Sequence, residues 1–570
     1  MNASGSFRGP AFVPWVDSRI LEDSPDFLVV DKPSGIPTHG GDAALGDDVV
    51  TRLAQRLEAC GRDAYLGVHQ RLDLGTSGVL AFVRQRELSG AVQRAFESGA
   101  VKKRYIAGVH IAASSPLARR DELVLEHRIE STGKLQRVSP RGKPCRARCR
   151  VLDRRAERAL VELLPETGRT HQLRVQLAAI DASIAGDRDY GGVRAQRLLL
   201  HAESLELLSR RFRAPVPPLF QRWLEARENE LGSSAEIEQK LADAASRRYP
   251  LLERTEAFRW VNAAADYLFG VEIDLYAGYA TLALSADEAI ARRDELADLV
   301  HAAGALGVYL KLRARTDLRR ADHSELAPTT AHRGDTAPSP LPVREGPLQI
   351  EIQLGDGLST GLFLDQRDNR ARVQAAAAGR RVLNLFSYTC SFSVAAALGG
   401  AARVTSVDLS RRALRRGEQN FRLNALDPTH HAFVCEDVLR YLTRAVERLE
   451  RAQTHSRSRS SDLVDSNTFD LIILDPPSFS TAGKGKTLSV DRDYARLVAL
   501  CLELLTARGQ LLAVTNHRKT SAPALRRIVL AEAERASRPV ESAKLLASGH
   551  DCPDGPDGPH PSKSVWLRLS

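Results

Sequence analysis

Short apolar segments alternate regularly with amphipathic segments through the last part of the chain, residues 346–570. The apolar segments have the length of buried strands, and they are residues 381–385, 404–408, 470–474 and 510–514. The segments between them suit helices, and they are residues 392–398, 411–423 and 494–505. Because parallel strands need crossover connections of this kind, the alternation predicts a doubly wound, Rossmann-like parallel sheet. A Ser-, Arg- and Asp-rich stretch, residues 452–468, interrupts the pattern and is expected to be a solvated loop.

The length of the chain requires further domains ahead of this sheet. At ~150 residues per domain, 570 residues allow three or four domains. Residues 1–220 alternate β-like runs with turn signals, which predicts a mixed, largely antiparallel sheet with a few helices. Residues 221–345 begin with a charge-rich helical stretch around 225–246 and continue with short strands, which predicts a small α/β domain. A polar, Pro-containing stretch, residues 327–345, is the best linker candidate. The expected fold class is multidomain, α+β and α/β.

Composition excludes several classes of protein. The hydrophobic fraction of 43% and the charged fraction of 27% are ordinary for globular proteins and exclude a wholly disordered chain. No apolar run reaches the ~18 residues that cross a bilayer, and the first residues lack the pattern of a secretory signal. Seven scattered cysteines favour a reducing compartment, so a cytoplasmic protein without a membrane partner is expected.

Net charge and cysteine spacing are weaker signals. The 81 Lys and Arg against 71 Asp and Glu fit a nucleic-acid partner, but also an Arg-rich composition. Cys145 and Cys149 are four residues apart without a second pair of ligands, so no metal site is expected. The stretch 549–560 holds potential metal ligands, but its Pro and Gly content predicts a surface loop.

A polar, turn-prone stretch, residues 69–78, leads into a candidate strand. It contains Asp73, with Arg71 before it and Thr76 and Ser77 after it. A carboxylate in this setting can be held ionised and hydrogen-bonded. A structural Asx-type turn is the alternative interpretation.

Five other segments accompany this stretch in a fixed order. They are Asp-Lys-Pro-Ser-Gly-Ile-Pro at 31–37, Lys-Arg-Tyr-Ile-Ala at 103–107, Thr-Gly-Arg-Thr-His-Gln-Leu-Arg-Val at 167–175, Gly-Asp-Arg-Asp-Tyr-Gly at 186–191 and Leu-Leu-His-Ala at 199–202. Together they closely resemble the RluA-type family of RNA pseudouridine synthases over about residues 25–210. One departure is Gln70, which separates His69 from Arg71 where the family has His directly before Arg-Leu-Asp.

The resemblance implies isomerisation of a uridine in RNA without a cofactor. Asp73 matches the nucleophilic aspartate, Tyr105 the tyrosine that stacks on the flipped base, and Arg174 the basic residue that pairs with the aspartate. Chemistry on a base requires extrusion from the stack, which agrees with a stacking tyrosine. The substrate-binding residues implied are Arg71, Thr76, Arg169 and His171. For Arg169 and His171, a structural role at the helix start or a phosphate contact is an open alternative.

The C-terminal sheet carries a second group of motifs at its strand ends. Residues 382–389 are a strand that runs into a tight polar turn, where an α/β sheet binds its ligand. The next strand ends in Asp408, which suits ribose hydroxyls, although a structural acid is equally expected there. Asp437 follows a third strand, and Asp475 begins an Asp-Pro-Pro-Ser-Phe stretch. No Gly-x-Gly-x-x-Gly motif is present, which disfavours a dinucleotide.

This constellation closely resembles class I S-adenosylmethionine-dependent methyltransferases, in particular the RlmI/RlmK group that acts on large-subunit ribosomal RNA. Residues 360–370, Thr-Gly-Leu-Phe-Leu-Asp-Gln-Arg-Asp-Asn-Arg, match the signature of that group, and the resemblance extends back to about residue 255. It implies that the middle segment is the small substrate-binding domain of those enzymes. It also implies S-adenosylmethionine as cofactor, bound by Asn384, Phe386, Tyr388, Asp408, Asp437 and Asp475.

The same resemblance implies acceptor-side residues. Asp475 is the catalytic residue of the acceptor loop, with substrate contacts from Pro476, Pro477 and Phe479. Arg367 and Arg370 match the signature arginines, on cofactor or RNA, with a structural ion pair as the equal alternative.

Two departures bear on this second site. Cys390 stands where the family has Gly, which reduces the freedom of the turn. The strand end at 514–519 has no cysteine, and Cys501 is expected in the core, so methylation of cytosine carbon 5 is disfavoured. A guanine nitrogen, which can attack a sulfonium methyl directly, fits better.

The sequence therefore predicts a bifunctional RNA-modifying enzyme whose partner is ribosomal RNA. Three alternatives remain. Only one domain could be active, the chain could be a non-catalytic RNA-binding or assembly factor, or the acceptor could be a protein amide.

Overall fold

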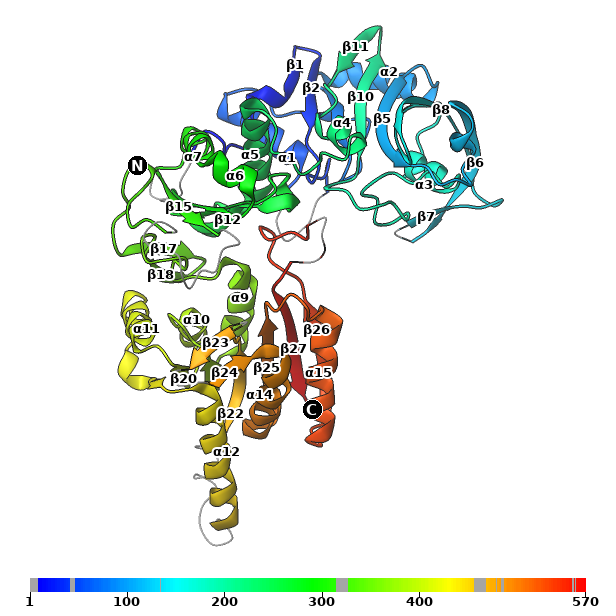
Figure 1. Cartoon of the computed structure of the whole chain (residues 1–570). Coiled ribbons are helices and arrows are strands. Elements are labelled where there is room, and N and C mark those ends of the chain that lie inside the picture. The colour runs from blue at the N-terminus through cyan, green and yellow to red at the C-terminus, as the bar shows by residue number, and fades with distance from the viewer. Residues whose placement is uncertain are drawn as a thin grey trace.

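The computed structural model describes most of the chain, in three parts that follow one another (Figure 1). The described residues are 9–40, 47–133, 135–313, 327–455, 468–477, 479–482, 486–555, 558 and 560–570. Within them, only the backbone is described for 453–455, 479–482 and 486–491. In Figure 1 the N-terminal sheet lies at the top, the middle segment beside it, and the C-terminal sheet below.

The N-terminal part is built on one 11-stranded sheet with the order β1-β2-β4-β10-β5-β9-β8-β6-β7, to which β3 and β11 add at β4 and β10. The strands are β1 (Ile20–Asp23), β2 (Phe27–Lys32), β3 (Gly67–Val68), β4 (Ser77–Val83), β5 (Lys102–His110), β6 (Glu122–Thr132), β7 (Leu135–Val138), β8 (Lys143–Arg155), β9 (Arg158–Pro165), β10 (Leu200–Leu207) and β11 (Arg210–Arg213). The helices are α1 (Val49–Ala59), α2 (Arg86–Glu97), α3 (Gln172–Ala178) and α4 (Leu219–Leu224). The strand pairs are antiparallel except β4 with β10, so the predicted mixed, largely antiparallel sheet is confirmed.

The middle segment holds a five-stranded sheet covered by helices. Its elements are α5 (Ser234–Arg248), β12 (Ala257–Asn262), β13 (Val271–Tyr276), β14 (Tyr279–Leu284), α6 (Asp287–Ala291), α7 (Arg293–Ala302), β15 (Gly307–Leu312) and β16 (Arg333–Gly334). The helix expected around 225–246 begins only at Ser234. Gly232 has a left-handed φ of 87°, and Ser233 and Glu236 form a capping box that starts the helix there.

The expectation of a linker at 327–345 is wrong for residues 341–345. Leu341–Glu345 is strand β17, and it pairs with β18 (Leu348–Ile352) in a separate hairpin. Its alternating burial, with Leu341, Val343 and Glu345 inside, explains the strand. A Pro-containing segment can therefore still form an edge hairpin.

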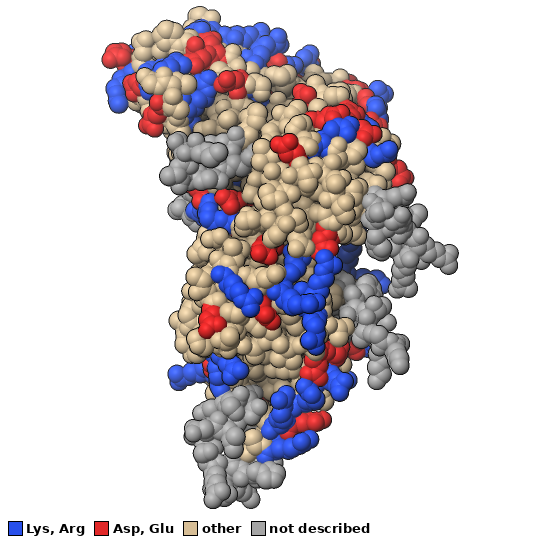
Figure 2. All heavy atoms as spheres, turned by 90° about the vertical axis from the view of Figure 1, so that its left-hand side faces the viewer, with Lys and Arg blue, Asp and Glu red and all other residues tan. Residues whose placement is uncertain are grey.

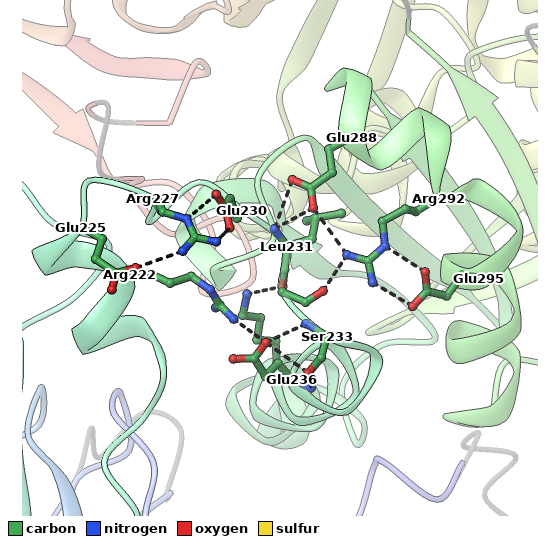
Figure 3. A network of polar contacts seen from close by, with 12 residues as sticks. Arg222, Glu225, Arg227, Glu230, Leu231, Ser233, Glu236, Glu288, Arg292 and Glu295 are labelled. Carbon is green, nitrogen blue, oxygen red and sulfur yellow. Dashed lines mark hydrogen bonds and ion pairs between the residues drawn. The ribbon is translucent and has the colours of Figure 1, made fainter.

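The junction between the N-terminal sheet and the middle segment is held by polar contacts (Figure 3). Arg222 on α4 pairs with Glu236 on α5 across the junction, and on the side of the middle segment Arg292, next to α7, binds Glu295 at 2.8 Å and the carbonyl of Gly232 at 2.6 Å. The N-terminal residues also cross this junction, because the Phe12 ring lies 4.9 Å from the Trp260 ring on β12. The N-terminal part and the middle segment therefore pack against each other.

The C-terminal part is a seven-stranded sheet with the order β21-β20-β19-β22-β25-β27-β26. Its strands are β19 (Arg381–Leu385), β20 (Arg403–Asp408), β21 (Ala432–Cys435), β22 (Phe469–Leu474), β25 (Leu505–Thr515), β26 (Val540–Leu546) and β27 (Lys563–Leu569). Its helices are α9 (Arg367–Ala376), α10 (Ser391–Leu398), α11 (Arg411–Leu423), α12 (Val438–His455), α14 (Val490–Leu504) and α15 (Ala522–Arg535). A short hairpin, β23 (Phe479–Ala482) with β24 (Lys486–Ser489), follows Pro477. The first five strands are parallel, and β27 runs antiparallel between β25 and the edge strand β26, so the predicted Rossmann-like sheet is confirmed with one antiparallel strand.

The described residues of the stretch 549–560 form a loop, as the composition predicts, but the loop is buried at Asp551 and Cys552 instead of lying wholly on the surface. Asp551 and Cys552 are buried, at 0% and 1% exposure. Arg248 on α5 donates to the Asp551 carbonyl at 3.0 Å, and Arg188 in the N-terminal part donates to the Gly555 carbonyl at 3.3 Å. Residues 551–555 therefore lie between all three parts, and arginines that are distant in the sequence donate hydrogen bonds to their carbonyl groups.

Within the described residues, no helix has both the length and the apolarity of a membrane span.

Candidate active sites

The first candidate site is centred on Asp73, in the loop that enters β4. The Asp73 carbonyl accepts a hydrogen bond from the Thr76 amide at 3.0 Å, which makes a tight turn. Its side chain is 30% exposed, so a reactant can reach the carboxylate. The Asp73 Oδ2 lies 3.6 Å from Arg174 Nη1 and 4.0 Å from His171 Nε2.

Arg174, on α3, is locked in place beside Asp73. Its Nε and Nη2 donate to the two oxygens of Asp187 at 2.7 Å each, and Nη2 also donates to Asp189 at 2.7 Å. Although burial alone lowers it, these carboxylates raise the pKa of Arg174 above its ordinary value. The guanidinium is therefore a permanent positive charge 3.6 Å from the Asp73 carboxylate.

Tyr105 lies on β5, opposite Ala202 on β10 and beside the Asp73 loop. Burial, with the charge of Asp73 adding to it, raises the pKa of Tyr105 well above the ordinary value of a phenol. The phenol therefore keeps its proton. A neutral aromatic ring of this kind can stack on a planar base.

His171 precedes α3 in the left-handed conformation, at φ 54°, which turns its ring toward Asp73. Its Nδ1 lies 2.8 Å from the Tyr190 hydroxyl. The guanidinium of Arg174 lies 4.9 Å from the centre of the Tyr190 ring. His171 is thus oriented by Tyr190 and belongs to the same cluster.

The second candidate site lies at the carboxyl ends of β19 and β20. The turn after β19 has left-handed residues at Phe386, Tyr388 and Cys390, with φ of 57°, 49° and 63°. Asp408 stabilises this turn, because its Oδ2 accepts from the Tyr388 amide and its Oδ1 from the Ser410 amide, both at 2.8 Å. The turn and the acid are therefore one preformed unit.

Asp475 stands at the end of β22, next to this unit. Burial and the nearby charge of Asp365 raise the pKa of the Asp475 carboxyl to about 7, against the pull of Arg370. Pro476 is buried and Pro477 is exposed. Phe479 begins β23, and its side chain lies outside the described residues. A carboxyl whose pKa is near neutrality can act in proton transfer at physiological pH.

Two family models match the chain. Residues 26–179 match the model of RNA pseudouridylate synthases, and residues 339–559 match the model of S-adenosylmethionine-dependent methyltransferases. The ribosomal RNA large subunit methyltransferase I of Klebsiella pneumoniae is 31% identical over 329 residues, which cover 57% of this chain and 77% of that protein.

The chain belongs to the ribosomal RNA large subunit methyltransferase I family. It carries an RNA pseudouridylate synthase domain ahead of the methyltransferase domain. A ribosomal RNA large subunit methyltransferase of Deinococcus radiodurans is 33% identical over 297 residues, 52% of this chain and 68% of that protein. The K/L methyltransferase of Syntrophotalea carbinolica is 43% identical over 178 residues, 31% of this chain, and the match spans only 22% of that longer protein.

The side chains around the methyltransferase turn fit S-adenosylmethionine. Asp408 offers carboxylate oxygens for ribose hydroxyls, and Asp437 follows the neighbouring strand β21. Phe363 and Leu409, next to this turn and to Asp408, are each 50% exposed, so large apolar side chains are available there to a ligand. The Phe363 ring lies 5.6 Å from the Tyr388 ring.

Cys390 fits the turn of the methyltransferase domain although its φ favours glycine. The thiol is fully buried and occupies room that Gly417 on α11 leaves open, since a Cβ at Gly417 would lie 2.3 Å from the Cys390 Sγ. Cys390 thus stands where the family has glycine, and Gly417 on α11 leaves the room that its side chain needs.

Asn384 and Asp437 have local partners in the structure. Asn384 is buried, and its Nδ2 donates to Ser393 Oγ at 2.8 Å, which in turn contacts Ser406. The Asp437 Oδ1 accepts from the Arg440 amide at 2.9 Å at the start of α12. Asn384 therefore stiffens the strand below the turn, and Asp437 caps a helix beside it.

Arg367 and Arg370 of the signature lie in buried ion pairs. Arg367 donates to both oxygens of Asp551 at 2.7 and 2.9 Å, and Arg370 donates to both oxygens of Glu345 at 2.6 Å each. Arg367 also donates to the Ala257 carbonyl at 2.7 Å. Both arginines therefore form the structural ion pairs of the alternative interpretation. Through Ala257 and Glu345 they also connect the methyltransferase domain to the middle segment.

Replacing Arg367 by Gln is expected to lower the free energy of unfolding by about 3–5 kcal/mol, because buried Asp551 loses its charged partner. Affinity for S-adenosylmethionine should not change. Urea unfolding and calorimetric titration measure the two quantities, and Arg372→Gln on the same helix is the control. Loss of cofactor affinity at unchanged stability would contradict the structural role.

The other predicted residues of the pseudouridine synthase site divide into two groups. Arg71 and Arg169 are exposed and can reach RNA. Thr76 is buried at 2% exposure and lies beneath the loop, away from solvent. Near it, the His69 Nε2 and the Gln70 Nε2 are buried without a hydrogen-bond partner among the described residues.

Three residues of the first cluster were missed as site residues. Asp187 and Asp189 hold Arg174, and Tyr190 orients His171. They belong to the Gly-Asp-Arg-Asp-Tyr-Gly segment at 186–191, which the sequence marks as a family motif. The spacing of its residues does not show that the two aspartates contact Arg174 on α3.

Proposed function

We propose that the protein isomerises a uridine in ribosomal RNA and methylates a guanine nitrogen in the same RNA, in the cytoplasm. The observation that carries the proposal is the pair of carboxyls, the partly exposed Asp73 and the more buried Asp475, each at the end of a loop or strand beside its own group of site residues. The three-part division into 1–220, 221–345 and 346–570 is part of the proposal, and it is supported by a separate main sheet in each part.

In the pseudouridine synthase domain, Asp73 acts as the nucleophile on the extruded nucleotide. Arg174 Nη1 lies 3.6 Å from the attacking carboxylate and fixes its position. Tyr105 stacks on the base as a neutral phenol, and His171 Nε2 lies 4.0 Å from the same carboxylate oxygen that Arg174 approaches. Arg71 and Arg169 contact RNA phosphates. These side chains supply the chemistry without a cofactor.

In the methyltransferase domain, the cofactor supplies an electrophilic methyl group on a sulfonium. The turn at Phe386 and Tyr388 and the acids Asp408 and Asp437 hold it. Asp475 accepts a hydrogen bond from the acceptor nitrogen and orients its lone pair, while Pro476 and Pro477 keep the loop rigid. Catalysis here is positioning, in line with a strand end at 514–519 that has no cysteine nucleophile.

Ribosomal RNA as the substrate is supported by the names of the relatives and by the surface. Figure 2 shows Lys and Arg side chains gathered over the methyltransferase half of one face. Exposed arginines of α11 and α12 are Arg411, Arg412, Arg415, Arg422, Arg440, Arg444, Arg448 and Arg451. Arginines in this number suit phosphate contacts.

Mass-spectrometric mapping of modified nucleosides in ribosomal RNA tests the proposal. A deletion strain is complemented with wild type, with Asp73→Ala or with Asp475→Ala. The wild type should restore one pseudouridine and one N-methylguanosine, the first variant only the methyl mark, and the second only the pseudouridine. Restoration of neither mark by the wild type would refute the enzymatic proposal, and restoration of one would leave a single active domain.

A further inference from the structure

The orientation of Asp73 depends on a second segment, residues 32–38, that binds the backbone on both sides of it. The Thr38 hydroxyl donates to the Leu72 carbonyl at 3.0 Å, and the Gly35 amide donates to the Leu74 carbonyl at 2.8 Å. The Ser34 hydroxyl donates to the Gly75 carbonyl at 2.8 Å. Whatever positions this segment therefore positions the nucleophile.

Lys32 is a charged residue of this segment that needs compensating partners, because its ammonium is fully buried. Its Nζ donates to the carbonyls of Pro33, Leu74 and Thr76 at 3.0, 3.3 and 2.9 Å. Burial and the charge of Arg197 lower the pKa of Lys32 to about 7. A buried ammonium keeps three donors only where negative charges compensate it.

Asp73 itself and Asp31 compensate the charge of Lys32, and Asp31 connects it to residues outside the pseudouridine synthase domain. Asp31, the residue before Lys32, pairs with Nη1 of Arg19. The Nη2 of the same guanidinium donates to both oxygens of Asp243 at 2.6 and 2.7 Å. Asp243 belongs to α5, which lies outside the residues that match the pseudouridylate synthase model.

Other residues on the same face of α5 contact the same region. Ser246, three residues after Asp243, accepts from Arg52 of α1 at 2.9 Å. Arg247 packs on Gly35, where an added Cβ would lie 3.1 Å from the Arg247 Cδ. The start of α5 is anchored by Arg222 and Ser233, as Figure 3 shows. The helix is thus a fixed support behind the segment.

We propose that Asp243 is a positioning residue for pseudouridine formation, acting through Arg19, Asp31 and Lys32 on the loop that carries Asp73. The proposal rests on the proposed function of the N-terminal site. The pseudouridine synthase site therefore depends on a helix of the middle segment, and the fusion is a structural requirement of the first reaction rather than a tether.

The test is Asp243→Asn in the full chain, assayed on ribosomal RNA from the deletion strain. The variant removes one negative charge and one strong acceptor, so Arg19 and Asp31 shift and the Asp73 loop loosens. The kcat for pseudouridine formation should fall by about 10- to 100-fold with KM for RNA unchanged, since a misplaced nucleophile slows the step after binding. Methylation by the same chain should stay at the wild-type rate.

Two matched variants separate positioning from general stability. Asp243→Glu, which keeps the charge, should restore part of the lost kcat. Glu238→Gln removes an exposed carboxylate from the same helix and should change neither activity. An unchanged kcat in Asp243→Asn, an equal loss in Glu238→Gln, or a parallel loss of methylation and of melting temperature would each overturn the proposal. Failure of the wild type to form pseudouridine would refute the proposed function instead.

Discussion

Replacing Asp73 by Asn is expected to reduce pseudouridine formation by about 10³-fold or more, while methylation by the same chain stays unchanged. The amide has the shape of the carboxylate but cannot attack the nucleotide. Arg174 does not depend on Asp73 for its place, because Asp187 and Asp189 hold it at 2.7 Å. The site should therefore keep its geometry and lose only its nucleophile. Quantitative nucleoside mass spectrometry of RNA treated in vitro measures both marks in one sample.

The control for this variant is Asp121→Asn, which removes an exposed carboxylate from the same domain. Asp121 pairs with Arg154 at 3.1 Å, and its side chain is 78% exposed, so little change is expected. A rate for Asp73→Asn close to that of Asp121→Asn would show that another group is the nucleophile. Equal loss of both marks would indicate that the two domains are coupled through the chain.

The strands and helices of the methyltransferase domain could be predicted because their signal is local. Residues 381–385 and 411–423 have the period and length of their elements, and both form as predicted. The stretches 341–345 and 549–560 could not be predicted, because their structure depends on distant partners. The first pairs with β18, and the second is buried at Asp551, which accepts hydrogen bonds from Arg248 of the middle segment and from Arg367 of α9.

The candidate sites divide in the same way. Asp73 and Arg174 stand out in motifs, and the structure places them 3.6 Å apart. The burial of Thr76 and the ion pairs of Arg367 and Arg370 depend on which side of a loop or helix faces the interior. A motif names the residue types and their order, but only the packed chain decides which polar groups face each other.

Methyl transfer is expected to rise with pH up to about 7 and then to level off, with Asp475 as the group responsible. Burial and the charge of Asp365 raise the pKa of this carboxyl to about 7, so it is protonated below that pH and ionised above it. Only the ionised form can accept a proton from the acceptor nitrogen, and it is also the stronger hydrogen-bond acceptor. The rate should therefore fall about tenfold for each pH unit below the pKa, in proportion to the ionised fraction.

Asp475→Asn separates this cause from other titrations. The amide cannot ionise, so the variant should be slower by about 10²–10⁴-fold and should have lost the step near pH 7. Single-turnover methyl transfer at saturating cofactor, measured from pH 5.5 to 9, gives both results; pseudouridine formation by the same chain reports whether RNA binding is intact at each pH. If the Asn variant keeps the step near pH 7, another group titrates there. If it keeps the wild-type rate, Asp475 does not contact the acceptor, and the Asp-Pro-Pro turn serves only to shape the loop.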